Sequence, residues 1–493
     1  MERVDVVIVG SGFSGLGMAI RLKQQGNDDF VVLERDGDVG GTWNANTYPG
    51  CACDIPSHLY SFSFAPNPDW SETYSPQPEI RDYLQRCADE FGVRPHVRLR
   101  TTLTEARWNE DEGRWDVETD GGDISARVLI SAMGPLTEPR IPDLPGLDEF
   151  EGETWHSARW NHDYDLAGKR VASIGTGASA IQYVPRIQPE VEQLHVFQRT
   201  APWIAPHPNR PITRFERALY RVFPPAQRLN RASVYALRES LVVGLAKRPQ
   251  LMKVIERVAR AHRERQVKDP ELLRKVTPDY AMGCKRILPS NRWYPTLQKP
   301  NVELVTGGVR EVRRNSVVGA DGVEREVDAI VFGTGFQVTE MPASDLLVGS
   351  DGRALSEVWG GSPRCHRGAT VPGFPNLFLL LGPNTGLGHN SMVYMIESQI
   401  AYVLDALRVM GERGAAVAEV RPGAVEGWNA SIDERMEGTV WTTGCVSWYQ
   451  DATGRNGAIW PDWTWRFRRE TARFDEAGYE LRAPAPAREA VPA

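Results

Sequence analysis

The sequence predicts an α/β protein that contains two similar strand–helix–strand units and a helical insertion. The first unit is marked by two short apolar runs, Val4–Val9 and Phe30–Leu33, which flank a glycine-rich turn and a helical pattern. This is the order of a βαβ unit. The same order returns at residues 171–197, about 165 residues further along (175 minus 10, counting from the first glycine of each turn). Residues 211–280 show helical spacing alone.

Length and composition limit the classes of protein. The chain has 493 residues, of which 41% are hydrophobic and 25% are charged, and a chain of this length folds into two or three domains. The net charge of −7 argues against nucleic acid as a partner. No apolar stretch approaches the roughly 18 residues of a spanning helix. No secretory pattern precedes the first strand-like run, so we expect a cytoplasmic protein without stable membrane insertion.

The six cysteines are scattered at positions 51, 53, 87, 284, 365 and 445. None belongs to a Cys-x-x-Cys pair, so a thioredoxin-type redox centre is not encoded. Cys51 and Cys53 are conceivable as half of a zinc site, but no second pair with metal-ligand spacing follows. We therefore expect reduced thiols and no metal site.

The first glycine motif reads Gly10-Ser11-Gly12-Phe13-Ser14-Gly15 and lies between a predicted strand and a predicted helix. This pattern is typical of a Rossmann-like dinucleotide site, in which a pyrophosphate lies at the helix N-terminus. Glu34 follows Gly10 by 24 residues. A carboxylate at that place accepts a hydrogen bond from a free ribose 2′-hydroxyl and repels a 2′-phosphate. The motif predicts FAD or NAD, and a purely structural turn is the alternative.

The second glycine motif, Gly175-Thr176-Gly177-Ala178-Ser179-Ala180, has alanine at its third conserved position. Arg199 stands 24 residues after its first glycine, where Glu34 stands in the first unit. A guanidinium can hold a 2′-phosphate through two hydrogen bonds, and the hydroxyl of Thr200 is beside it. The second site is therefore predicted to bind NADPH, the alternative being an ordinary exposed arginine.

The combination of one acidic and one basic dinucleotide site predicts a flavin enzyme that is reduced by NADPH. The first would hold a flavin permanently, and the second would bring NADPH as the hydride donor. The reduced flavin then needs an electron acceptor. Because the chain has no paired cysteines of redox type, molecular oxygen is the acceptor that we expect.

The helical segment is basic, with sixteen Lys or Arg against seven Asp or Glu in residues 211–280. Leu251, Val254, Ile255 and Val258 recur at helical spacing. We expect solvated helices beside anionic cofactors. A membrane-surface helix is the alternative, but such helices usually carry Trp and Phe on the apolar face, and residues 242–275 contain no aromatic residue.

The segment before the second glycine motif carries a recognisable pattern: Phe150, Gly152, His156 and Trp160 stand in the order Phe-x-Gly-x-x-x-His-x-x-x-Trp. It resembles the fingerprint of class B flavoprotein monooxygenases, specifically the type I Baeyer–Villiger monooxygenases. Asn161 follows where that family has Pro or Asp.

The resemblance extends over almost the whole chain. Gly40-Gly41-Thr42-Trp43 is similar to the family's flavin-side motif, residues 48–54 (Tyr-Pro-Gly-Cys-Ala-Cys-Asp) to its active-site loop, and Gly382-Pro383-Asn384 to the segment that closes over the flavin. Residues 328–336 resemble its linker, with Gly333 where alanine is usual. Gly283-Cys284-Lys285-Arg286, with Trp-Tyr-Pro at 293–295, resembles the 4-hydroxyacetophenone monooxygenase branch.

The resemblance implies an enzyme that uses NADPH and O₂ to form a C4a-peroxyflavin, which inserts one oxygen next to a ketone carbonyl and gives an ester or lactone. It assigns Arg286 to stabilise the anionic peroxide, a preorganised charge of the kind that lowers such barriers by several kcal/mol. Asp54 would hold that guanidinium in place. From the residues alone, a surface ion-pair arginine and a turn aspartate are the alternatives.

The resemblance also implies further site residues. Lys285 would lie near the 2′-phosphate and Trp448 beside the nicotinamide ribose, while His156 and Trp160 would transmit NADPH binding between domains. The expected cofactor-binding residues are Gly10, Gly12, Phe13, Ser14, Gly15, Glu34, Gly41, Thr42, Trp43, Asp54, Tyr60, Gly175, Thr176, Gly177, Ala178, Ser179, Ala180, Arg199, Thr200, Lys285, Arg286, Asn384 and Trp448.

Two other functions are kept open: N- or S-oxygenation of a soft nucleophile, and flavin binding without turnover. Self-association into a homo-oligomer is also open. The expected domains are an FAD-binding domain at 1–140 and 345–482, an NADPH-binding domain at 141–210 and 283–344, a helical insert at 211–282 and a disordered tail at 483–493.

Overall fold

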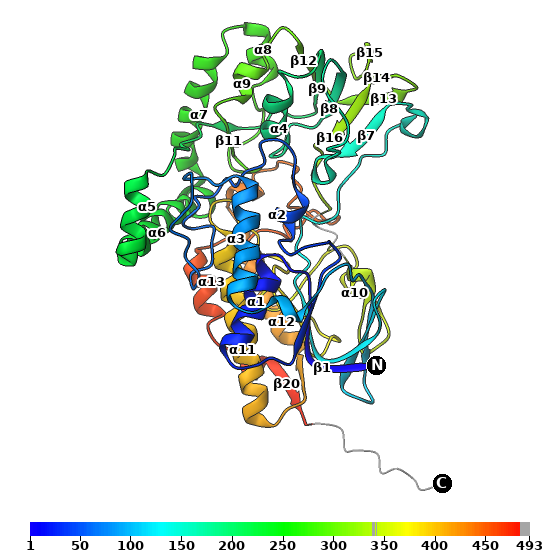
Figure 1. Ribbon diagram of the computed structural model, residues 1–493, viewed down its shortest axis with the longest axis vertical. Coiled ribbons are helices and arrows are strands. Elements are labelled where there is room, and N and C mark those ends of the chain that lie inside the picture. The colour runs from blue at the N-terminus through cyan, green and yellow to red at the C-terminus, as the bar shows by residue number, and fades with distance from the viewer. Residues whose placement is uncertain (338–340, 342, 484–493) are drawn as a thin grey trace.

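The computed structural model describes residues 1–337, 341 and 343–483. Nearly all of the tail that the sequence predicts to be disordered, residues 484–493, lies outside the described residues. Figure 1 shows two α/β regions, one around β1, α1, α3 and α11 and the other around β7, β8, β9 and β16, with a helical segment along one side.

The larger sheet has eight strands, with β18 paired to β6 beside the main path. Its order is β17 (Leu347–Val348), β4 (Leu103–Asn109), β5 (Arg114–Thr119), β6 (Ile124–Ser131), β1 (Glu2–Val9), β2 (Phe30–Leu33) and β3 (Val97–Arg98), with β18 at Leu377–Leu379. Strand β1 runs parallel to both β2 and β6. These strands are apolar runs because both faces of a parallel sheet are covered.

Helices cover this sheet and pack on one another. Helix α1 (Phe13–Gln24) contacts both α3 (Gln77–Glu90) and α11 (Met392–Arg413). Other elements of this region are α2 (Thr42–Ala45), α10 (Leu355–Trp359), α12 (Pro422–Met436), α13 (Thr464–Glu470), and the antiparallel pair β19 (Val417–Val420) and β20 (Tyr479–Arg482). The chain therefore leaves this region after β6 and returns to it after residue 345.

The second sheet is parallel throughout and has the order β12 (Val302–Thr306), β9 (Gln193–Gln198), β8 (Arg170–Ile174), β16 (Ala329–Phe332) and β7 (Glu153–His156). Helix α4 (Ala180–Ile187) follows β8. A three-stranded antiparallel sheet is attached: β13 (Val309–Arg313), β14 (Ser316–Gly319) and β15 (Glu324–Glu326). The strands predicted around 171–174, 194–197, 301–304 and 329–332 are all present.

The helical segment contains α5 (Arg214–Val222), α6 (Pro224–Glu239), α7 (Met252–Gln266) and α8 (Pro270–Lys275), followed by α9 (Trp293–Thr296). A π-helix at Val243–Lys247 and the short parallel pair β10 (Ile204–Ala205) and β11 (Leu288–Pro289) accompany them. The spacing of Leu251, Val254 and Val258 correctly predicts a helix, but these side chains are exposed. Helix α7 instead buries Met252, Ala259 and the polar pair at 262–263, against the neighbouring strands and helices.

Short 3₁₀ turns complete the connections, at Arg94–His96, Leu147–Glu149, Ser157–Arg159, Pro249–Leu251, Ser344–Leu346, Val440–Thr442 and Glu476–Gly478.

The prediction that all six cysteines are reduced thiols is wrong for two of them. Cys284 and Cys445 form a disulfide across 161 residues, with Cα atoms 6.4 Å apart. The other four are free and buried. Sequence spacing carries no signal for this pair, because only the packing of the C-terminal segment against the end of the helical insert brings the two positions together.

Candidate functional site

The first glycine loop leaves space above the start of α1. Gly10 has φ +101°, and a Cβ there would lie 2.7 Å from the carbonyl oxygen of Ala132. A Cβ on Gly12 would meet only the Cα of Gly41, at 3.6 Å. The N-terminus of α1 has no side-chain cap and no acidic residue in its first turn. Its free N–H groups and open space suit a pyrophosphate.

Glu34 is buried at the end of β2 and is tied to this loop. Its Oε2 accepts hydrogen bonds from the backbone N–H (2.9 Å) and the hydroxyl (2.5 Å) of Ser11, and its Oε1 accepts one from the N–H of Asp36 (2.9 Å). The carboxylate is thus fixed beside the glycine loop, and Oε1, which accepts one hydrogen bond, keeps a lone pair for a ribose hydroxyl.

An aromatic wall stands next to the loop. Phe13 packs edge-on against Tyr60, with ring centroids 5.1 Å apart, and the indole N–H of Trp43 donates to the Tyr60 hydroxyl at 3.2 Å. Gly41 precedes Thr42 at the start of α2, and a Cβ on it would lie 2.8 Å from the Cα of Gly12. Ser14 is buried inside α1. The predicted flavin-side residues therefore gather in one place.

The second glycine loop repeats these features between β8 and α4. Gly175 has φ +106°, and a Cβ there would lie 2.4 Å from the carbonyl oxygen of Gly333, whereas a Cβ on Gly177 would meet little more than that same oxygen at 3.9 Å. Ala178 and Ser179 lead into Ala180, the first residue of α4, which has no side-chain cap. The unusual Gly333 is explained by the hydroxyl of Tyr183, which would lie 2.9 Å from an added Cβ.

A basic pocket of about 290 Å³ lies at the end of β9, where Arg199 and Thr200 stand. It is also lined by Arg274 and Lys275 of α8, which the sequence reasoning did not single out. The residues lining it are Gln198, Arg199, Thr200, Ala201, Arg274, Lys275, Thr277, Asp279 and Thr306. Three cations around one small pocket fit a phosphate.

Lys285 is close to this pocket and lies with its ammonium 4.7 Å from the ring centroid of Tyr280. Burial and the positive charge of Arg199 lower the pKa of Lys285, and Asp279 raises it. The electrostatic effect of Arg199 on Lys285 means that the two predicted 2′-phosphate residues share one environment.

Arg286 and Asp54 form a two-point ion pair. Nε of Arg286 donates to Oδ2 of Asp54 at 2.7 Å, and Nη2 donates to Oδ1 at 2.6 Å. Nη1 reaches the carbonyl oxygen of Leu387 at 3.4 Å. The two side chains are 29% and 22% exposed, so the pair is largely buried but still partly accessible.

The charges of this pair are stabilised mutually. Burial alone would raise the pKa of Asp54, but the charge and hydrogen bonds of Arg286, helped by Arg238, lower it overall. Burial disfavours the charged guanidinium, yet Asp54 keeps the pKa of Arg286 above its ordinary value. Arg238, at the end of α6, also donates to the Asp54 carbonyl oxygen at 2.8 Å. No motif in the sequence identified Arg238.

Tyr449 is a second residue that the sequence reasoning did not single out. Its hydroxyl is buried and has no hydrogen-bond partner within the described residues. Burial raises the pKa of Tyr449 to about 12, against a lowering by Arg286. Its ring lies on that of Trp448, with centroids 4.3 Å apart, and Trp448 is 45% exposed. The Cys284–Cys445 disulfide links this loop to the loop of Arg286.

The segment 48–54 joins the two α/β regions. The hydroxyl of Tyr48 donates to Gln182 Oε1 of α4 at 2.9 Å, and Gln182 Nε2 donates to the carbonyl oxygen of Ala52 at 3.0 Å. Asn384 is anchored by the C-terminal segment: its Nδ2 donates to the carbonyl oxygens of Asn456 (2.8 Å) and Ile459 (3.0 Å).

The fingerprint residues lie at the edge of the second sheet. Gly152 is needed because a Cβ would lie 2.5 Å from the carbonyl oxygen of Asp328 and from the Phe150 ring, and not because of a positive φ. Nδ1 of His156 accepts from the N–H of Ala158 at 3.1 Å. Trp160 packs against Tyr183, with ring centroids 5.4 Å apart.

Because His156 is buried, we expect the free energy of unfolding to depend on pH. Burial lowers its pKa to about 4, so between about pH 6.5 and pH 4 the unfolded chain binds a proton that the folded chain does not. This contribution to stability is complete above pH 6.5 and is lost as the pH falls, by up to about 1.4 kcal/mol per pH unit. His156→Asn keeps an acceptor for Ala158, and its free energy of unfolding should fall less steeply in this window. Equal slopes in urea titrations would contradict this.

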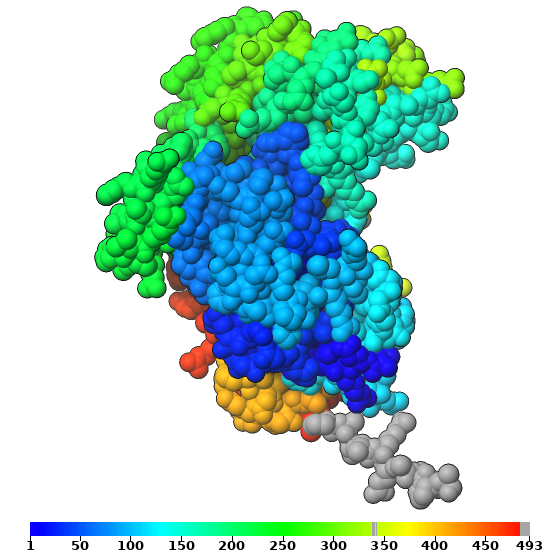
Figure 2. Space-filling view, in the orientation of Figure 1, coloured from blue at the N-terminus to red at the C-terminus, as the bar shows by residue number. Residues whose placement is uncertain are grey.

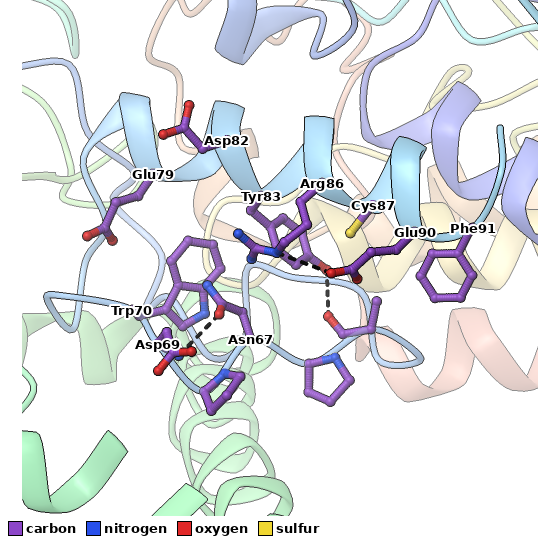
Figure 3. Close-up of a pocket in the computed structure, with 13 residues that line it drawn as sticks. Asn67, Asp69, Trp70, Glu79, Asp82, Tyr83, Arg86, Cys87, Glu90 and Phe91 are labelled. Atoms are coloured by element: carbon purple, nitrogen blue, oxygen red, sulfur yellow. Dashed lines mark hydrogen bonds and ion pairs between the residues drawn. The ribbon is translucent and has the colours of Figure 1, made fainter. Parts of the chain in front are cut away.

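A separate cavity of about 530 Å³ lies between α3 and the loop 65–70, and it contains none of the predicted site residues (Figure 3). Within residues 1–337, 341 and 343–483, no cluster of His, Cys, Asp and Glu could hold a metal ion. In the same residues, no helix is long and apolar enough to cross a membrane.

Comparison with protein families identifies residues 3–273 as matching the model described as "Flavin-binding monooxygenase-like". This match covers more than half of the chain. The chain belongs to this family. Membership in a flavin-binding family is consistent with the two glycine loops described above.

Two curated relatives in this family are similar over nearly their whole length. A protein of Streptomyces coelicolor named "Baeyer-Villiger monooxygenase" is 54% identical over 99% of this chain and 94% of its own. One of Pseudomonas aeruginosa with the same name is 50% identical over 97% and 91%. The prediction of a flavin monooxygenase of the Baeyer–Villiger type is thereby confirmed.

Solved structures confirm the fold. "Oxidized steroid monooxygenase bound to NADP" has a TM-score of 0.86 and 34% identity, over 97% of this chain and 99% of that one. "OTEMO complex with FAD and NADP" has a TM-score of 0.87 and 28% identity, over the same shares. Both cofactors predicted from the two glycine motifs occur in these relatives.

Proposed function

We propose that this chain uses NADPH and O₂ to insert one oxygen next to a ketone carbonyl, with Arg286 and Asp54 as the catalytic residues. The observation that carries the proposal is the two-point Arg286–Asp54 ion pair. It connects the loop 48–54, which resembles the family's active-site loop, to the segment after the helical insert. FAD held at the first glycine loop would supply the hydride-accepting and dioxygen-activating chemistry of this reaction.

The chain's own residues fit FAD at the first site. Gly12 leaves room for the pyrophosphate, and the free N–H groups at the uncapped start of α1 would donate hydrogen bonds to it. Glu34 would accept a hydrogen bond from a ribose hydroxyl. Trp43 is buried and Tyr60 is partly buried, and together they would shield this side of the flavin from water. Exclusion of water strengthens each electrostatic interaction within the site.

The guanidinium of Arg286 supplies a permanent positive charge, because its pKa lies above the ordinary value and the group stays protonated. Asp54 holds two of its nitrogens and leaves Nη1 with one long contact, to the carbonyl of Leu387. Nη1 is therefore the donor available for negative charge that develops on the reacting oxygen. A preorganised donor of this kind raises kcat by about 10²–10³.

Arg199 should determine the choice between NADPH and NADH. Arg199→Ala removes a charged contact to the 2′-phosphate alone, worth about 1.5–3 kcal/mol, so the KM for NADPH should rise about 10- to 150-fold while that for NADH changes little. Steady-state oxidation of both cofactors measures this. Arg310→Ala, an exposed arginine on the adjoining small sheet, is the control. Equal losses with both cofactors would remove Arg199 from this role.

The substrate class follows from the finer resemblance. Residues 283–286 and 293–295 support a place in the 4-hydroxyacetophenone branch, and hence an aryl ketone as the preferred substrate. Product analysis with cyclic, linear and aryl ketones and a thioether tests this. A preference for the aryl ketone, with ester as product, supports the assignment. Sulfoxide as the main product would favour oxygenation of soft nucleophiles, which needs no anionic oxidant.

The domain division and the location are part of the same proposal. The larger sheet takes strands from residues 2–131 and 347–379, and the second from 153–332. This distribution supports a discontinuous FAD domain (1–140 and 345–482) enclosing the NADPH domain (141–210 and 283–344) and the insert at 211–282. Four buried free thiols support a reducing compartment, with Cys284–Cys445 as an exception.

A further inference from the structure

Helices α5 and α6 form a hairpin that projects from the side of the molecule (Figures 1 and 2). Its exposed apolar side chains are Phe215, Leu219, Val222, Phe223, Leu229 and Leu237. Phe215 is 77% exposed and Val222 is 86% exposed. Exposed apolar side chains scattered singly need no explanation, but a group on one ridge indicates an interaction surface.

The same hairpin is positively charged. Arg214, Arg217 and Arg228 have no acidic partner within the described part of the chain, and Arg221 pairs with Asp69 at 2.5 Å. Glu216 is the only acidic side chain of α5, and its carboxylate is occupied by the N–H of the N-cap residue Thr213 and by Arg210. The ridge therefore presents apolar and basic groups together.

A surface of opposite charge lies directly beside the ridge. The cavity of about 530 Å³ between α3 and the loop 65–70 is lined by four carboxylates and one cation, Arg86 (Figure 3). The carboxylates are Asp69, Glu79, Asp82 and Glu90, of which Asp82 pairs with Arg81 at 2.8 Å and Glu90 lies 3.9 Å from Arg86. Pro66, Pro68 and Phe91 add apolar wall. The Arg221–Asp69 ion pair joins the two surfaces.

We propose that the α5–α6 ridge of one chain docks into the α3 cavity of a second copy, and the reverse, in a two-fold dimer. In a two-fold dimer, the first patch of each chain contacts the second patch of the other chain, so both contacts form at once. A basic apolar ridge next to an acidic hollow on one surface meets this requirement in charge. An anionic membrane would attract the ridge but repel the carboxylates beside it.

Sedimentation velocity of the FAD-loaded protein tests the dimer first. The parent should sediment at twice the chain mass of 55.0 kDa. Phe215→Glu with Val222→Glu places one charge near each end of α5, at the two most exposed apolar residues of the ridge. The dimer dissociation constant should rise at least about 30-fold. Val323→Glu, at a 51% exposed valine in the turn before β15, is the matched control and should stay dimeric. Flavin absorbance reports that each variant is folded.

Charge reversal then tests which surfaces meet. Arg214→Glu with Arg217→Glu reverses the ridge, and Asp82→Arg with Glu90→Arg reverses the cavity; each double variant alone should be monomeric. Mixed in equal amounts, they should form a heterodimer, because each ridge then faces a cavity of opposite charge.

Three results would overturn the proposal: a monomeric parent at tens of micromolar, a dimer that survives the apolar-ridge variant, or a mixture that stays monomeric. A monomeric parent that co-sediments with phosphatidylglycerol vesicles, but not with phosphatidylcholine vesicles, would assign the ridge to an anionic membrane surface instead.

Discussion

Arg286→Ala should lower ketone oxidation by at least about 100-fold while FAD stays bound and NADPH is still oxidised. The variant removes the fixed charge that the proposed mechanism places at the reacting oxygen, and one preorganised donor of this kind accounts for about 10²–10³ in kcat. Arg286 makes no contact with either glycine loop that the structure records, so cofactor binding should persist. Reduced oxygen should then leave as hydrogen peroxide.

The measurement compares NADPH consumed, hydrogen peroxide released and ester formed. Arg127→Ala is the matched control, since Arg127 also makes a two-point pair, with Asp5, and the two side chains are similarly exposed at 25% and 24%. Arg286→Lys should restore little, because an ammonium cannot bind both oxygens of Asp54 as a planar guanidinium does. Ester formation near the parent rate in Arg286→Ala would place the catalytic cation elsewhere.

Gly12→Val should yield a folded protein without flavin. Gly12 has φ −76°, which any residue adopts, and its Cβ would meet only the Cα of Gly41 at 3.6 Å. The protein itself therefore tolerates a side chain there, but the valine methyls would fill the space above α1 where the pyrophosphate must approach. Loss of bound FAD should abolish NADPH-dependent activity.

Flavin absorbance of the purified variant, together with its circular dichroism, measures the outcome. Gly411→Val is the control, because Gly411 lies in helix α11 with nothing within 4 Å of an added Cβ, and it should remain yellow. A Gly12→Val protein with the parent's flavin content would show that the first glycine loop is not the pyrophosphate site.

The two cofactor sites could be predicted from the sequence because each is local. A glycine loop needs a strand, a tight turn and a helix start within a few residues. The residue expected to select the cofactor follows at a constant distance, as Glu34 and Arg199 do. The observed strands β1, β2, β8 and β16 agree closely with the apolar runs that predict them.

Residues contributed by distant segments could not be predicted in this way. Arg238 and Tyr449 surround Arg286 only because α6 and the C-terminal loop fold against it. The Cys284–Cys445 disulfide was missed for the same reason. Leu251, Val254 and Val258 had the spacing of a buried face and are exposed, because periodicity shows that a helix has an apolar side but not that another element covers it.

By itself the sequence determined the α/β class, the two dinucleotide sites with opposite charge, and through its motifs the family of the chain. The resemblance predicted that Asp54 pairs with Arg286, 232 residues away, and the tertiary structure supplied the two-point geometry of that pair. Only the tertiary structure decided that Arg238 and Tyr449 surround the pair, and that the basic ridge lies beside the acidic cavity. The physical reason is that local patterns encode backbone conformation and single-residue chemistry. Juxtaposition of distant side chains instead depends on how the whole chain buries its apolar surface.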